Sequence, residues 1–94
     1  TAIFSQSDGM AIGAMKAIEE EGMKVPEDFS IIGFDDVEAS RYVKPALTTI
    51  AQNKEKMGSS ASELLIKMIE EDNKNIKPII LPVELIKRES CKQI

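Results

Sequence analysis

A short apolar run at residues 29–34, ended directly by Asp35 and Asp36, constrains the fold of this chain more than any other segment. The run follows Pro26 and carries Gly33 near its end, and its length is typical of a buried strand. In an open α/β sheet, ligands bind in the crevice at the carboxyl ends of the strands. Asp35 is therefore a candidate acceptor for ligand hydroxyl groups, although aspartate is also common after strands as a turn residue.

The bulk composition is that of an ordinary globular domain, with 43% hydrophobic and 30% charged residues in a chain of 94. This length corresponds to one small domain or to a piece of a larger one. Because the chain begins at Thr1 and residues 2–4 already read as a buried strand, we expect the protein to continue upstream. No segment approaches the roughly 18 apolar residues that a membrane span needs, so we expect no membrane partner.

The net charge of −4, from 12 basic and 16 acidic residues, argues against direct binding of nucleic acid by this segment. Cys91 is the only cysteine and histidine is absent, so the sequence predicts no disulfide and no metal site based on cysteine or histidine. A single unpaired cysteine favours a reducing compartment, and we expect a cytoplasmic protein.

Turn residues and apolar periodicity predict an alternation of strands and helices. In chain order, the expected elements are a strand at 1–5, a helix at 8–21, a strand at 29–34, a helical turn at 37–44, an extended segment at 47–50, a helix from 52 or 53 to about 72, a polar turn at 73–77, and strands at 79–81 and 84–87 that Pro82 separates. Ser7 or Asp8 can cap the first helix, and Gly22 can close it. This order predicts an α/β fold with a parallel sheet flanked by helices.

Both predicted helices are amphipathic. The first has a core stripe of Ala11, Ala14, Met15, Ala17 and Ile18, and the second has an apolar face of Met57, Ala61, Leu64, Leu65, Met68 and Ile69. Ile12 lies outside the first stripe, which makes it a candidate for an interface, although a lone exposed isoleucine is also normal.

Several short blocks of sequence, taken together in their order along the chain, form a recognisable pattern. They are Thr1-Ala2-Ile3-Phe4, Asp8-Gly9-Met10-Ala11-Ile12-Gly13-Ala14, residues 25–36, Arg41-Tyr42, Pro45-Ala46-Leu47-Thr48-Thr49-Ile50 with Gln52, Met57-Gly58 and residues 81–90. Together they closely resemble the C-terminal part of lactose/galactose-repressor family transcription regulators. The resemblance covers nearly all 94 residues, and it implies a periplasmic-binding-protein-like effector domain in which a ligand is held between two α/β lobes. It also implies a helix-turn-helix module near the true N-terminus, outside this chain.

The resemblance implies that the chain holds pieces of both lobes and a complete version of neither. Residues from 1 to about 47 would belong to the C-terminal lobe, residues from about 51 to 78 to a helix region of the N-terminal lobe, and residues from about 79 to 94 to strands that cross back. Alone, such a fragment would leave much of its apolar surface uncovered.

The resemblance also implies functional residues. The expected ligand-binding positions are Asp35, Ser7, Asp8 and Phe34, and the expected homodimer interface contains Ile12, Lys16, Arg41, Tyr42 and Val43. The family usually has asparagine where this chain has Ser7, and a single hydroxyl offers fewer hydrogen bonds than an amide, which points to a different or larger ligand. Asp8 can instead be a helix cap, Asp36 a turn residue, and Phe34 a core residue.

These observations lead us to expect the effector-sensing part of a DNA-binding transcriptional regulator. A small polar ligand, a sugar or a nucleobase-like molecule, would shift operator affinity by binding two lobe arrangements unequally. The alternative is a solute-binding protein of a sugar uptake system. An enzyme could use Asp35 and Asp36 to hold Mg²⁺, but the chain has no glycine-rich phosphate loop and no nucleophile arrangement. We therefore expect no catalytic residue, no metal and no cofactor.

Overall fold

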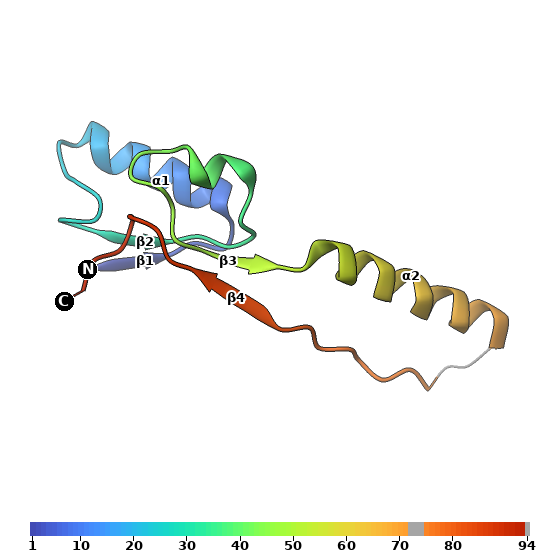
Figure 1. Ribbon diagram of the computed structural model, residues 1–94. Helices are drawn as coiled ribbons and strands as arrows, with labels where there is room; N and C mark the ends of the chain where they lie inside the picture. The colour runs from blue at the N-terminus through green and yellow to red at the C-terminus, as the bar shows by residue number, and fades with distance from the viewer. Residues whose placement is uncertain (72–74, 94) are drawn as a thin grey trace. The chain divides into compact units, whose positions relative to one another are not determined.

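The computed structural model describes residues 1–71 and 75–93. Their elements in chain order are β1 (Ala2–Phe4), α1 (Asp8–Glu20), β2 (Ser30–Ile32), the 3₁₀ helix η1 (Glu38–Arg41), β3 (Thr49–Gln52), α2 (Lys54–Glu71) and β4 (Val83–Ile86) (Figure 1). This order confirms the predicted α/β fold. Neither helix in the described ranges has the length and apolar character needed to cross a membrane.

Two short pairs of strands form the sheet structure. β1 lies parallel to β2, with Ile3 opposite Ile31, and β3 pairs with β4. Two isolated parallel bridges, Ile32 to Thr48 and Asp35 to Ala51, join the end of β2 to β3. The parallel pairing that the sequence predicted is therefore present between β1 and β2.

The chain divides into two compact units. The first contains Thr1–Gln52 together with Glu84–Ile94, and the second contains Asn53–Val83. The assignment of the chain to parts of two lobes, with boundaries near residues 47, 51 and 79, stays a prediction.

Helix α1 packs on the first unit's core through one narrow face. Ser7 is the N-cap, since its Oγ accepts a hydrogen bond from the Met10 backbone N–H at 3.2 Å. After the helix ends, Gly22 adopts a φ of 77°, as predicted for a left-handed closing residue. The buried apolar residues of this unit are Ala11, Met15, Ile18, Ile31 and Leu47. The stripe predicted for α1 is wrong at Ala17, which is exposed because only the side of α1 facing β2 and Leu47 is covered.

Helix α2 begins after Asn53, whose Oδ1 accepts from the Lys56 N–H at 3.0 Å, so Asn53 rather than Gln52 starts the helix. None of its residues is buried. The predicted apolar face exists, but within the described ranges it is largely open to solvent, with Ile69 72% and Leu65 57% exposed. This agrees with the expectation that the chain alone leaves apolar surface uncovered.

Two expectations about strands need correction. The structure has no strand at residues 79–81, because among the described residues no neighbouring strand supplies ladder hydrogen bonds there, and β4 covers only Val83–Ile86. The first strand is not buried, since Ala2 and Phe4 are exposed and β1 pairs only with β2 among the described residues. The predicted polar turn at 73–77 begins at residues outside the described ranges.

Candidate ligand-binding site

The carboxyl ends of β1 and β2 lie at the same edge, because the two strands are parallel. The Ser5 N–H donates to the Ile32 carbonyl at 2.8 Å, and the Asp8 N–H donates to the Phe34 carbonyl at 3.0 Å. These two hydrogen bonds bring the segment that begins α1 beside the segment that follows β2. Three of the four expected ligand-binding residues, Ser7, Phe34 and Asp35, are half-buried on these two segments, and the fourth, Asp8, is buried between them.

Asp8 is fully buried and is held from two directions. Its Oδ2 accepts from the Val37 N–H at 2.8 Å, and its Oδ1 accepts from the Thr49 hydroxyl at 2.5 Å. Gly33 makes this approach possible, because a Cβ at that position would collide with Asp8 Oδ1 and lie 2.9 Å from Leu47 Cδ2. The Asp8 carboxylate therefore ties the first turn of α1 to β3 and to the loop after β2, while the cap is Ser7.

Asp35 and Asp36, hereafter the acidic corner, both have a left-handed backbone, with φ values of 115° and 55°. Such conformations in residues other than glycine cost about 1–3 kcal/mol each and cluster at functional sites. The Asp35 N–H donates to the Ile50 carbonyl at 2.9 Å, and the Asp36 N–H reaches Thr49 Oγ1 at 3.4 Å. Strand β3 thus holds the backbone N–H groups of both corner residues, through the Ile50 carbonyl and the Thr49 hydroxyl.

The side chain of Asp35 is half-buried and only partly engaged. Its Oδ1 accepts from Gln52 Nε2 at 2.7 Å, and in the described part of the chain Oδ2 has no hydrogen bond. One carboxylate oxygen is therefore fixed in direction while the other can accept from a ligand hydroxyl. The sequence did not identify Gln52 as a site residue. Its only signal was its place two residues after Ile50, at the end of an extended segment.

The side chain of Asp36 serves the fold. Arg88 Nη2 donates to Asp36 Oδ1 at 2.7 Å, and the two side chains are 14% and 15% exposed, respectively. The hydrogen bond from Arg88, its charge, the Ser40 hydroxyl and the more distant Arg41 hold the pKa of Asp36 below its usual value, against the opposing effect of burial. Two adjacent aspartates thus have different environments: in the described residues, Arg88 and Ser40 hold the Asp36 carboxylate through Oδ1, while Gln52 alone holds that of Asp35.

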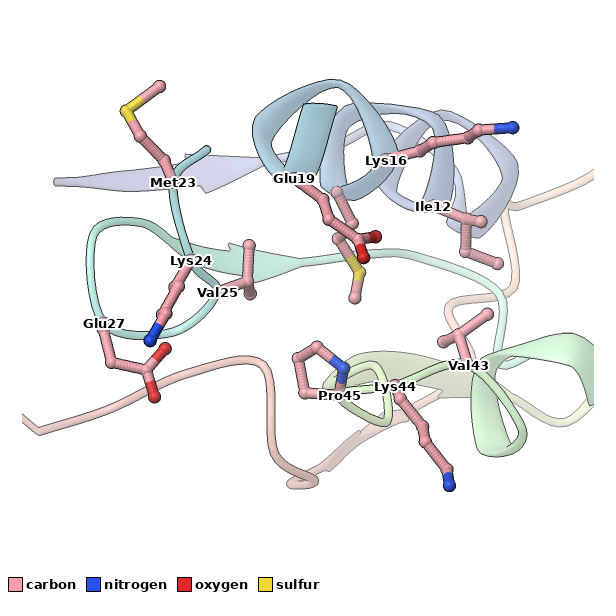
Figure 2. Close-up of a pocket in the computed structure, with 11 residues that line it drawn as sticks. Ile12, Lys16, Glu19, Met23, Lys24, Val25, Glu27, Val43, Lys44 and Pro45 are labelled. Atoms are coloured by element: carbon pink, nitrogen blue, oxygen red, sulfur yellow. The ribbon is translucent and has the colours of Figure 1, made fainter. Parts of the chain in front are cut away.

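An open groove of about 550 Å³ lies elsewhere in the first unit, between α1, the turn at 22–28 and the segment at 43–45. Figure 2 shows Ile12, Lys16 and Glu19 on one wall and Val43, Lys44 and Pro45 on the other. Three of the expected dimer residues, Ile12, Lys16 and Val43, line this groove. The other two are exposed outside it, with Arg41 62% exposed at its side chain and Tyr42 73% exposed.

In the described residues, no three Asp, Glu, Cys or His side chains lie close enough together to hold a metal ion. Asp35 can accept a hydrogen bond from a polar ligand, and the Ser7 hydroxyl on the neighbouring segment can donate or accept one.

The sequence matches the family described as periplasmic binding protein-like domain over residues 1–91. It is 48% identical over 94 residues to the HTH-type transcriptional regulator MalR of Clostridium butyricum. It is also 42% identical over 90 residues to the ribose operon repressor of Haemophilus influenzae. These alignments cover 100% and 96% of this chain but only 28% and 27% of the two relatives, so the chain spans less than a third of their length.

Solved structures agree with this match. A LacI family transcriptional regulator from Enterococcus faecium with bound ribose has a TM-score of 0.83 at 40% identity, covering 97% of this chain and 34% of that one. The complex of the transcriptional regulator CelR with cellobiose has a TM-score of 0.87 at 31% identity, covering 95% and 27%. The lac repressor dimer bound to operator and an anti-inducer has a TM-score of 0.86 at 37% identity, covering 97% and 32%.

Proposed function

This chain belongs to the periplasmic binding protein-like domain family, as found in LacI-family transcriptional regulators, and on this premise we propose that it senses the effector of such a regulator. In this proposal it forms part of the domain that holds a small polar ligand, and ligand binding changes the affinity of the whole protein for operator DNA. The named relatives are regulators, which favours this function over a solute-binding protein of an uptake system and over an enzyme.

A sugar is the ligand that fits best. The observation that carries this proposal is the Asp35 carboxylate, which Gln52 fixes through one oxygen while the other oxygen is open to a hydroxyl donor. A charge-assisted hydrogen bond from a ligand hydroxyl to such a carboxylate contributes about 1.5–3 kcal/mol. Ribose and cellobiose are bound in two of the similar structures, which supports the same ligand class here.

The other residues of the site take supporting roles in this proposal. The Ser7 hydroxyl and the Phe34 ring are half-buried beside the corner and would border the ligand. Asp8, which is fully buried with both oxygens occupied, would hold these segments in place rather than touch the ligand. In this proposal the opposite wall of the ligand site comes from a second lobe.

We propose three further properties of the full-length protein. It is a cytoplasmic homodimer, it contacts operator DNA through a helix-turn-helix outside this chain, and its dimer interface includes Ile12, Lys16 and Val43 of the groove with the exposed Arg41 and Tyr42. The similar structure of a repressor dimer bound to operator DNA supports the proposed homodimer and the proposed operator contact.

The test is a pair of titrations on the full-length regulator. Calorimetry with ribose, cellobiose, other mono- and disaccharides and free nucleobases identifies the ligand, and fluorescence anisotropy with operator DNA measures the effect of that ligand on DNA affinity. We expect one sugar to bind and to change DNA affinity reciprocally. Sugar binding by a full-length protein without any operator binding would instead support the uptake function, and binding of a nucleobase alone would reject a sugar effector.

A further inference from the structure

Arg88 reaches the acidic corner from the segment that follows β4. Its Nη2 donates to Asp36 Oδ1 at 2.7 Å, while its Nη1 donates to Ser40 Oγ at 2.8 Å and to the Leu47 carbonyl at 2.9 Å. The Arg88 backbone N–H donates to Thr48 Oγ1 at 2.9 Å, which fixes the base of the side chain as well. Since the side chains of Arg88 and Asp36 are only 14% and 15% exposed, water and salt screen this ion pair less than they screen a pair on the surface.

The corner needs such support because two consecutive non-glycine residues have a positive φ. Left-handed conformations of this kind persist only where the surroundings determine them strongly. Strand β3 holds the corner through the backbone N–H groups of Asp35 and Asp36. Within the described ranges, the Asp36 carboxylate is the only side-chain link from the corner to the segment after β4. Without its partner it would be a half-desolvated charge and would be drawn toward water, turning the peptide that it shares with Asp35.

We propose that Arg88 is a positioning residue for the ligand site: by holding Asp36 it fixes the backbone that directs the Asp35 carboxylate, without touching the ligand itself. The inference rests on the proposed ligand role of Asp35. It separates the two aspartates by function, one directed at the ligand and one anchored so that the first keeps its direction.

The first measurement needs no ligand. Hydrogen exchange followed by mass spectrometry on the full-length regulator compares the wild type with Arg88→Gln, at a temperature where both are folded. We expect the peptide spanning residues 33–40 to exchange about tenfold faster or more in the variant, while α1 is unchanged. Lys87→Gln is the matched control, because Lys87 is the exposed cation next to Arg88 in the chain and, in the described residues, forms no ion pair with Asp36. This control should leave the exchange of residues 33–40 as in the wild type.

The second measurement is sugar affinity by calorimetry, with ribose as the first probe and cellobiose as the second. Arg88→Gln should weaken binding about tenfold or more, and Arg88→Lys, which keeps the charge but not the planar fork, should recover part of the loss. If Arg88→Gln does not fold, Arg88→Lys is compared with the wild type in both measurements, the hydrogen exchange of residues 33–40 and the sugar affinity.

The two measurements separate the failure of this inference from the failure of the proposed function. A wild type that binds no sugar rejects the proposed function, while the exchange of residues 33–40 still decides the role of Arg88. A variant with a lower melting temperature, but with wild-type exchange at residues 33–40 and wild-type sugar affinity, would overturn the positioning role and leave Arg88 as an ordinary stabilising residue.

Discussion

At the residue scale, Asp35 and Asp36 show how neighbours of the same type acquire different chemistry. The Asp36 carboxylate is paired with Arg88, at 2.7 Å from its Oδ1, and is committed to this contact within the protein. Asp35 accepts one hydrogen bond from Gln52 and has an oxygen to spare. Substitution of the two residues should therefore affect different quantities, with ligand affinity depending directly on Asp35.

Asp35→Ala removes the acceptor that we assign to a ligand hydroxyl. In the full-length regulator we expect sugar affinity to fall by about 1.5–3 kcal/mol, or roughly 10- to 150-fold, while DNA binding without ligand is retained. Calorimetry and operator anisotropy measure the two quantities. Glu38→Ala is the matched control, because Glu38 is an exposed carboxylate three residues away. Unchanged sugar affinity in Asp35→Ala would assign Asp35 to the turn alone.

Gly33→Ala tests the close approach of Asp8 to the end of β2. The added methyl group would collide with Asp8 Oδ1 and crowd Leu47, so we expect a loss of about 1–3 kcal/mol in the free energy of unfolding, measured by urea titration. Gly13→Ala is the control, since a Cβ there meets nothing within 4 Å inside α1 and should stabilise the helix by up to about 1 kcal/mol. Equal effects of the two substitutions would show that the approach of Asp8 is not required.

The sequence predicted Asp35 as an acceptor because its position after an apolar run is a local pattern. It did not predict the buried role of Asp8, the link from Gln52 or the anchor at Arg88. Each of these depends on a partner 17 to 52 residues away along the chain, as the separations of the hydrogen-bonded pairs show. Local spacing carries no information about such contacts, so these roles needed the structure.

At the element scale, the two helices differ in what covers them. Helix α1 buries Ala11, Met15 and Ile18 against the first unit, whereas the 18-residue helix α2 buries none of its residues. Both were predictable because capping residues and a 3.6-residue apolar period are local signals. The strand expected at 79–81 was wrong because strand formation depends on a neighbour, which the local sequence does not specify.

Helix α2 should be the less stable element when the 94-residue chain is studied alone. An isolated helix of this length is marginal in water, since most helical stability in proteins comes from packing of the apolar face. We therefore expect the backbone amides of α2 to exchange with solvent at least about tenfold faster than those of α1, measured by hydrogen exchange. In the full-length protein the difference should shrink, because the proposed second lobe covers α2. Equal protection of the two helices in the isolated chain would contradict this expectation.

At the scale of the whole molecule, the first unit has a small core and an open groove beside it. Only five apolar residues are buried in its described part, while the groove of about 550 Å³ has an apolar floor bordered by charges of both signs. The charged residues that line it are Lys16, Glu19, Lys24, Glu27 and Lys44. Mixed charges around an apolar centre are typical of an interface with a partner. A two-fold contact places the same patch on both copies, so lysines of one copy can meet the two carboxylates of the other.

Ile12→Glu tests whether this groove belongs to the homodimer interface of the full-length regulator. Burying an isoleucine side chain contributes about 1.5–3 kcal/mol, and a two-fold interface loses this contribution twice. The introduced carboxylate also lies on the same helix as Glu19, which adds repulsion. We expect the dimer dissociation constant to rise at least about a hundredfold, measured by analytical ultracentrifugation. Met10→Glu is the matched control, because Met10 is a 61% exposed apolar residue of α1 that does not line the groove, and it should leave the dimer intact. A dimer that survives Ile12→Glu with unchanged affinity would place the interface on another surface, and the exposed Arg41 and Tyr42 would be the next positions to substitute.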